Sequence, residues 1–134
     1  MPVLDRSARA FLARPGRYAT LASVDPDGSP LQAVVWYLLE DDDTILLNSR
    51  VGRRWPSNLL RDPRVSLSVE DGDDYVSIRG VAEHLHDGDE AYEDIAALAR
   101  RYTSGGDLEH RLADFRTQQR ISFRLRPRTV TLHH

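Results

Sequence analysis

The chain has 134 residues, the length of one domain, with 40% hydrophobic and 29% charged residues and a formal net charge of −3. This balance excludes a surface that is basic throughout, as in a general nucleic-acid binder, and the longest apolar run, 33–39, is far shorter than the ~20 residues that cross a bilayer. The absence of cysteine excludes disulfides, thiolate nucleophiles, iron–sulfur clusters and cysteine zinc sites.

The first half of the chain predicts one helix and three strands. In chain order these are a helix at 6–14 and strands at 17–24, 31–39 and 44–49. The first two strands form a hairpin around the polar turn 25–28. Strand 31–39 is apolar on both faces, so we expect it to lie between the core and a second layer, a ligand or another subunit.

The second half predicts a mixture of helices and longer strands. In order these are a helical segment at 55–61, strands at 64–70 and 75–86, helices at 89–102 and 107–117, and a strand pair or one bent strand at 120–132. The apolar positions change parity at Gly80 and after Pro127, which indicates bulges or bends. Tight turns favour antiparallel pairing, so we expect one domain over 1–134, a small antiparallel β-barrel with peripheral helices.

The segment 48–64 is the best candidate for a binding site. Its turn carries three arginines, Arg50, Arg53 and Arg54. Pro56 suits the first turn of the helix that follows, and the N–H groups of Ser57 and Asn58 are expected to be free there. Free N–H groups beside guanidinium groups form an anion site, with phosphate as the expected ligand. A solvated basic turn with a helix cap is the alternative interpretation.

Four short motifs along nearly the whole chain carry a family resemblance. They are Ala10-Phe11-Leu12 with Ala19-Thr20-Leu21-Ala22, Asp27-Gly28-Ser29-Pro30 before Gln32-Ala33-Val34-Val35-Trp36-Tyr37, Asn58-Leu59-Leu60-Arg61-Asp62-Pro63-Arg64-Val65, and Gly80-Val81-Ala82-Glu83. In this order the chain resembles the split β-barrel flavin and deazaflavin oxidoreductases, the pyridoxamine-phosphate-oxidase-like superfamily. It is most similar to the branch that uses coenzyme F420. The resemblance implies an FMN-binding-like split barrel of six or seven antiparallel strands and a homodimer with cofactor sites at the subunit interface.

The resemblance also implies site residues by position. They are Arg53 and Arg54 for the cofactor phosphate, Asn48 and Ser49 for the ribityl chain, Val34, Val35 and Trp36 for the ring system, and Arg50 for an acidic tail. Trp55 stands where many relatives have a lysine. Its ring can stack on a planar ligand or fix the start of the helix.

The implied chemistry is hydride transfer from reduced F420 to an electrophilic acceptor such as a conjugated carbonyl, a quinone or a tetrapyrrole. The sequence assigns no catalytic proton donor. Three other functions stay open within this fold: an FMN-dependent oxidase or reductase, a cofactor-carrying protein without turnover, and a haem-degrading protein, which would need an iron ligand facing a pocket. Single-strand nucleic-acid binding is the competitor from another class, and the acidic isoelectric point counts against it.

The remaining composition narrows the chemistry further. All 18 Lys and Arg residues are Arg, so a lysine Schiff base is excluded and a bound anion must be held by Arg, His, hydroxyl or backbone N–H groups. His84 and His86 lie two apart on a predicted strand and would share a face, but no third ligand has motif spacing, so we expect no metal site. The first residues lack a basic region followed by an apolar stretch, so we expect no signal peptide and a cytoplasmic location.

Overall fold

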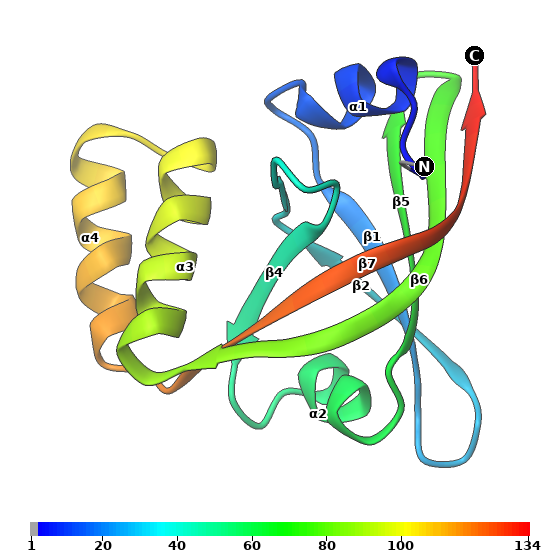
Figure 1. Cartoon of the computed structure of the whole chain (residues 1–134). Helices are drawn as coiled ribbons and strands as arrows, with labels where there is room; N and C mark the ends of the chain where they lie inside the picture. The colour runs from blue at the N-terminus through cyan, green and yellow to red at the C-terminus, as the bar shows by residue number, and fades with distance from the viewer. Residues whose placement is uncertain (1–2) are drawn as a thin grey trace.

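The computed structural model describes residues 3–134, which form seven strands and four helices (Figure 1). The strands are β1 (Ala19–Val24), β2 (Pro30–Val35), β3 (Leu38–Leu39), β4 (Ile45–Arg50), β5 (Arg64–Asp71), β6 (Asp74–Asp87) and β7 (Arg120–His133). The helices are α1 (Arg6–Ala13), α2 (Arg54–Arg61), α3 (Gly88–Tyr102) and α4 (Gly105–Arg116). All the predicted elements are present, with one difference: strand 31–39 is divided into β2 and β3. The final segment, predicted as a strand pair or one bent strand, is a single strand.

The strands form one curled antiparallel sheet in the order β2-β1-β5-β6-β7-β4-β3. β2 and β3 follow each other in the chain but lie at opposite edges of this sheet. The two residues between them therefore close the curl, which gives the split barrel that the sequence predicts. Figure 1 shows α1 at one end of the curled sheet and α2 at the other, with α3 and α4 side by side outside β4.

The prediction of one continuous strand over 31–39 was wrong, because the backbone leaves the sheet at Trp36 and Tyr37. The Tyr37 ring is fully buried in the core, and its hydroxyl donates to the carbonyl oxygen of Leu12 at 2.8 Å. The Tyr37 N–H donates to the hydroxyl of Tyr102 at 3.3 Å instead of to a neighbouring strand. Trp36 packs with the cluster beneath α3 and α4. The two side chains thus anchor the turn between the sheet edges.

The expected burial of 31–39 on both faces is also not met within the chain. β2 is an edge strand, and the side chain of Val34 is 72% exposed. The strand with two buried faces is β4 instead. Its Leu47 belongs to the main core inside the curl, whereas Leu46 packs with Ile95 and Leu98 of α3. The sheet therefore separates a large core from a smaller cluster under the helical pair.

Two bulges reorganise the long pairing of β6 with β7. The first, predicted from parity, lies at Gly80, where Arg128 is left without a partner. A Cβ atom on Gly80 would lie 2.2 Å from the carbonyl oxygen of Arg126, so only glycine fits this close approach. The second bulge falls between His84 and His86, and it overturns the expectation that they share a face. His84 contacts Asp87, whereas His86 contacts Asp94 of α3.

Candidate functional site

A hollow of about 300 Å³ lies where β2, β4, the start of α2, the helical pair and the start of β7 meet. Its lining residues are Val34, Val35, Trp36, Asn48, Ser49, Arg50, Arg53, Trp55, Ile95, Arg111, Phe115, Gln118 and Arg120. The structure therefore brings together all the predicted site residues except Arg54. The residues that sequence reasoning missed come from α3, α4 and the start of β7.

Arg54 points to the other side of α2, where its guanidinium forms an ion pair with Asp25. Asn58 donates to the same carboxylate at 2.9 Å, so this contact holds the hairpin turn against the helix. The expectation of a free Ser57 N–H was wrong as well. The helix begins at Arg54, and the Ser57 N–H donates to the carbonyl oxygen of Arg53 at 3.2 Å. The position of Arg54 gives no support for a role in the hollow.

Arg120 is the most informative of the residues that the sequence did not indicate. It is 9% exposed at the first position of β7. Its Nε donates to Oδ1 of Asn48 at 3.0 Å and one terminal nitrogen donates to Oε1 of Gln118 at 2.8 Å, while its guanidinium lies 4.8 Å from the ring centre of Phe115. Both acceptors are neutral amides. Among residues 3–134 no carboxylate lies within ion-pair distance of Arg120.

Asn48 fixes the position of Arg120 from the opposite strand. Its amide nitrogen donates to the carbonyl oxygen of Ala91 at 2.9 Å and to the hydroxyl of Ser122 at 2.8 Å. These bonds leave the amide oxygen directed at the guanidinium. Because all three contacts are buried, the amide is held in one orientation and Arg120 in one place.

Arg50, Arg53 and Arg120, which we call the open cluster, concentrate positive charge at one end of the hollow. Arg50 lies directly opposite Arg120 in the pairing of β4 with β7, an arrangement of like charges that destabilises a sheet. Burial, followed by the charges of Arg53 and Arg50, lowers the pKa of Arg120 to about 10. None of the described residues that line the hollow is Asp or Glu. The open cluster is therefore a site where an anion would relieve repulsion.

Aromatic rings form the other end of the hollow. The Trp36 ring stacks on Tyr102 with centres 5.1 Å apart and an angle of 6° between the planes, and Tyr102 stacks in turn on Tyr18. Phe115 meets Trp36 edge-on at 6.4 Å. Trp55, by contrast, is 7% exposed and packs on Phe123 at 6.0 Å, so most of its ring belongs to the core. Trp36 is thus the better placed of the two tryptophans to contact a planar ligand.

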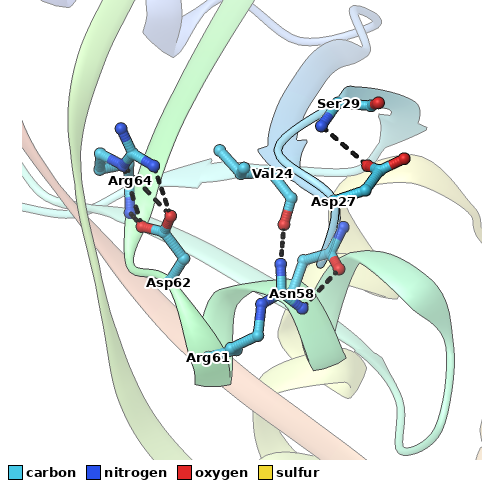
Figure 2. A network of polar contacts seen from close by, with 7 residues as sticks. All are labelled: Val24, Asp27, Ser29, Asn58, Arg61, Asp62 and Arg64. Atoms are coloured by element: carbon cyan, nitrogen blue, oxygen red, sulfur yellow. Dashed lines mark hydrogen bonds and ion pairs between the residues drawn. The ribbon is translucent and has the colours of Figure 1, made fainter.

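A second group of arginines lies on the far side of α2, and we call Arg54, Arg61 and Arg64 the paired cluster. Figure 2 shows Arg61 donating to the carbonyl oxygen of Val24, and the carboxylate of Asp62 accepting from Arg64 at 2.7 Å. The bond from Arg64 lowers the pKa of Asp62 to about 2. Each guanidinium in this cluster has an oxygen acceptor from the chain itself, so none needs a ligand.

Neither a metal centre nor a membrane-spanning helix is found in the part of the chain that the structure describes. No three His, Cys, Asp or Glu side chains within residues 3–134 are gathered as metal ligands. None of the helices described over the same range has the length and apolar character that a membrane span requires.

Comparison with known proteins gives a family and several related structures. Residues 4–134 match the family described as pyridoxamine 5′-phosphate oxidase. A conserved hypothetical protein from Mycobacterium tuberculosis is 30% identical, with a TM-score of 0.78 over 97% of this chain and 84% of that one. An F420 reductase is 26% identical, with a TM-score of 0.72 over 92% and 94% of the two chains. General stress protein 26 from Bacillus anthracis, 15% identical with a TM-score of 0.65 over 92% and 88%, shares the fold. No curated protein matches the sequence.

Proposed function

Because the chain belongs to the pyridoxamine 5′-phosphate oxidase family, we propose that it is an oxidoreductase that binds coenzyme F420 in the hollow between β4, α2 and the helical pair. In this proposal it transfers hydride between the reduced coenzyme and an electrophilic small molecule. The observation that carries the proposal is the open cluster, in which the buried Arg120 is held in place without a carboxylate partner.

The donor set of the open cluster fits a phosphate group. A buried charge without a partner of opposite sign is costly, so a chain that keeps one in a fixed orientation gains most when an anion binds. Guanidinium groups form short, charge-assisted hydrogen bonds with phosphate oxygens. Arg120 is already oriented by Asn48 and Gln118, and the exposed Arg50 and Arg53 can close on the same anion from the turn.

The charge of the hollow favours F420 over FMN. The three arginines of the open cluster line it, and they face no carboxylate among the described lining residues. The phosphate of FMN carries up to about two negative charges, whereas F420 adds an acidic polyglutamate tail. The similarity to an F420 reductase supports the same choice. FMN has the same ribityl phosphate and a related ring, so it is the comparison ligand for the test.

The residues of the chain bind and orient the coenzyme and exclude water from it. The bound coenzyme supplies the hydride, which is its own chemistry. We assign the ring system to the wall formed by Val34, Val35 and Trp36, where the stack with Tyr102 fixes the plane of the indole. The open cluster would hold the phosphate, and Asn48 and Ser49 would contact the ribityl chain.

We further propose that a second copy of the chain completes the site. A volume of about 300 Å³ is at the lower limit for small-molecule pockets, which span about 300–1,000 Å³. Val34, which lines the hollow, is 72% exposed on an edge strand. A partner subunit that covers this edge would enlarge the apolar wall and exclude water from the ring system.

The test is calorimetric titration of the purified protein with F420 and, separately, with FMN. We expect F420 to bind with a micromolar or lower Kd and FMN to bind at least about tenfold more weakly. Binding of FMN alone would contradict the assignment of F420 and indicate an FMN-dependent enzyme. Binding of neither would overturn the proposed function.

A further inference from the structure

We propose that Arg111 holds an anionic group of the hydride acceptor, so that the substrates of this protein are planar conjugated carboxylic acids. This inference rests on the proposed function, because it assigns the acceptor to the ring end of the hollow. In the reaction the acceptor gains hydride from C5 of the reduced coenzyme and a proton from water, so that two electrons pass to it. The carboxylate itself is unchanged.

The first observation is where the side chain of Arg111 points. Arg111 lies on α4 and its guanidinium is 5.3 Å from the ring centre of Trp36. Asp107 and Asp114 lie four residues before and three residues after it, spacings at which helical ion pairs form. Arg111 forms an ion pair with neither, and Asp114 contacts His110 instead. The charge of Arg111 is therefore directed into the hollow and is not neutralised on its own helix.

The second observation is that Arg111 is separate from the open cluster. The guanidinium of Arg120 lies over the ring of Phe115 and donates to Asn48 and Gln118, whereas the guanidinium of Arg111 lies over the ring of Trp36. The hollow thus carries two cationic points, one at the phosphate end and one at the tryptophan. Of the four arginines among the described lining residues, Arg111 is the one whose guanidinium lies over the ring of Trp36.

The third observation is the shape of the wall around this second cationic point. The Trp36 ring stacks on Tyr102 and lies beside the guanidinium of Arg111, and Phe115, one helical turn after Arg111, meets it edge-on. Aromatic walls of this kind favour planar molecules. The fork of a guanidinium matches the two oxygens of a carboxylate, which gives the bond direction as well as strength. Together these features select a flat, conjugated acid over a neutral quinone or carbonyl compound.

The experiment measures binding of two nearly isosteric probes, 2-naphthoate and 2-naphthamide, to the protein saturated with F420. We expect the wild type to bind the acid at least about tenfold more tightly than the amide. Arg111→Gln should abolish this preference and change the Kd for F420 by less than about threefold. Arg100→Gln removes the same charge from an exposed position of α3 that does not line the hollow, and it should keep the preference.

Three results would overturn the inference. The first is equal binding of acid and amide by the wild type, and the second is a preference that survives in Arg111→Gln. The third is an F420 affinity that falls in this variant as much as the naphthoate affinity does, which would assign Arg111 to the coenzyme. If F420 does not bind the wild type at all, the proposed function itself fails, so the two failures are distinguishable.

Discussion

Helix α2 separates two groups of arginines that have opposite surroundings. On one side the paired cluster donates to oxygen atoms of Asp25, Val24 and Asp62. Figure 2 shows the contacts with Val24 and Asp62. On the other side Arg120 of the open cluster donates to two neutral amides, and it faces Arg50 across two paired strands. The first arrangement holds the fold together, whereas the second weakens it in the absence of an anion.

An arginine-rich turn can carry both ligand-binding and structural arginines. Arg53 and Arg54 are neighbours in the sequence, yet only Arg53 lines the hollow. What distinguishes a binding arginine from a structural one is whether the chain already supplies its acceptor. Substitutions in one cluster at a time should therefore affect F420 affinity and thermal stability separately.

The largest effect is expected for Arg120→Met, which removes the buried charge but keeps much of the side-chain volume. We expect the Kd for F420 to rise by about 10- to 100-fold, because a buried charge-assisted hydrogen bond is lost. Without F420, the variant should unfold within a few degrees of the wild type. The removal of a buried, unpaired charge offsets the loss of the hydrogen bond that Arg120 donates to Asn48. Calorimetry and thermal unfolding give the two values.

The matched control for this change lies in the paired cluster. Arg54→Gln removes a charge that contacts Asp25 and not the hollow, so it should leave the Kd unchanged. A loss of binding in Arg54→Gln that equals the loss in Arg120→Met would show that the two clusters do not differ in function.

The next largest effect is expected for Arg50→Gln combined with Arg53→Gln. Both side chains are exposed, so we expect each to contribute up to about tenfold to the affinity for F420 through charge attraction that salt screens. The Kd of the double variant should therefore depend less on ionic strength than that of the wild type. A salt dependence equal to that of the wild type would exclude these two residues from the site.

A smaller effect is expected from pH. The pKa of Arg120, about 10 in the free protein, is below its usual value, so the charged form that binds an anion is lost as the pH rises above about 10. We expect constant F420 affinity near neutral pH and a fall of up to about tenfold per pH unit above 10. The free protein should become more stable as the pH rises above about 10, because the folded chain loses the proton of Arg120 while the unfolded chain still keeps it. Arg120→Met should lack the fall in affinity.

The smallest effect is expected for Asp62→Asn in the paired cluster. The hydrogen bonds from Arg64 lower the pKa of this carboxyl to about 2, so they stabilise the folded state above the unfolded pKa. The contribution disappears as the pH falls through the folded value. Thermal unfolding should show a small loss at neutral pH and no loss near pH 2, with F420 binding unchanged. A change in Kd would contradict the separation of the clusters.

The fold could be predicted from the sequence because its signals are local. Alternation in 64–70 identified β5, and the change of parity at Gly80 located a bulge that close backbone contact requires. The break at Trp36 and Tyr37 could not be predicted. It depends on Leu12 and Tyr102, which are distant in sequence and supply the acceptor and the hydroxyl that hold Tyr37.

From the residue pattern alone the site could be predicted only where one segment carries it, whereas Val34, Val35 and Trp36 were expected from the family resemblance. The turn after β4 supplied Arg50 and Arg53, because a basic turn before a helix is a local pattern. In the sequence, Arg120 cannot be distinguished from any other polar residue at the start of a strand. Only the pairing of β4 with β7 places it opposite Arg50. The position of Arg54 was missed for the same reason, since its partner Asp25 lies in a distant turn.

The most direct test places a carboxylate beside Arg120, which has neutral amides as its acceptors. Gln118 accepts from Arg120 at 2.8 Å, so Gln118→Glu places a carboxylate there with little change in shape. We predict opposite effects: the free protein unfolds at a higher temperature, and the Kd for F420 rises by about tenfold or more. A variant that is no more stable and binds F420 as tightly as the wild type would contradict the claim that Arg120 is kept unpaired for an anionic ligand.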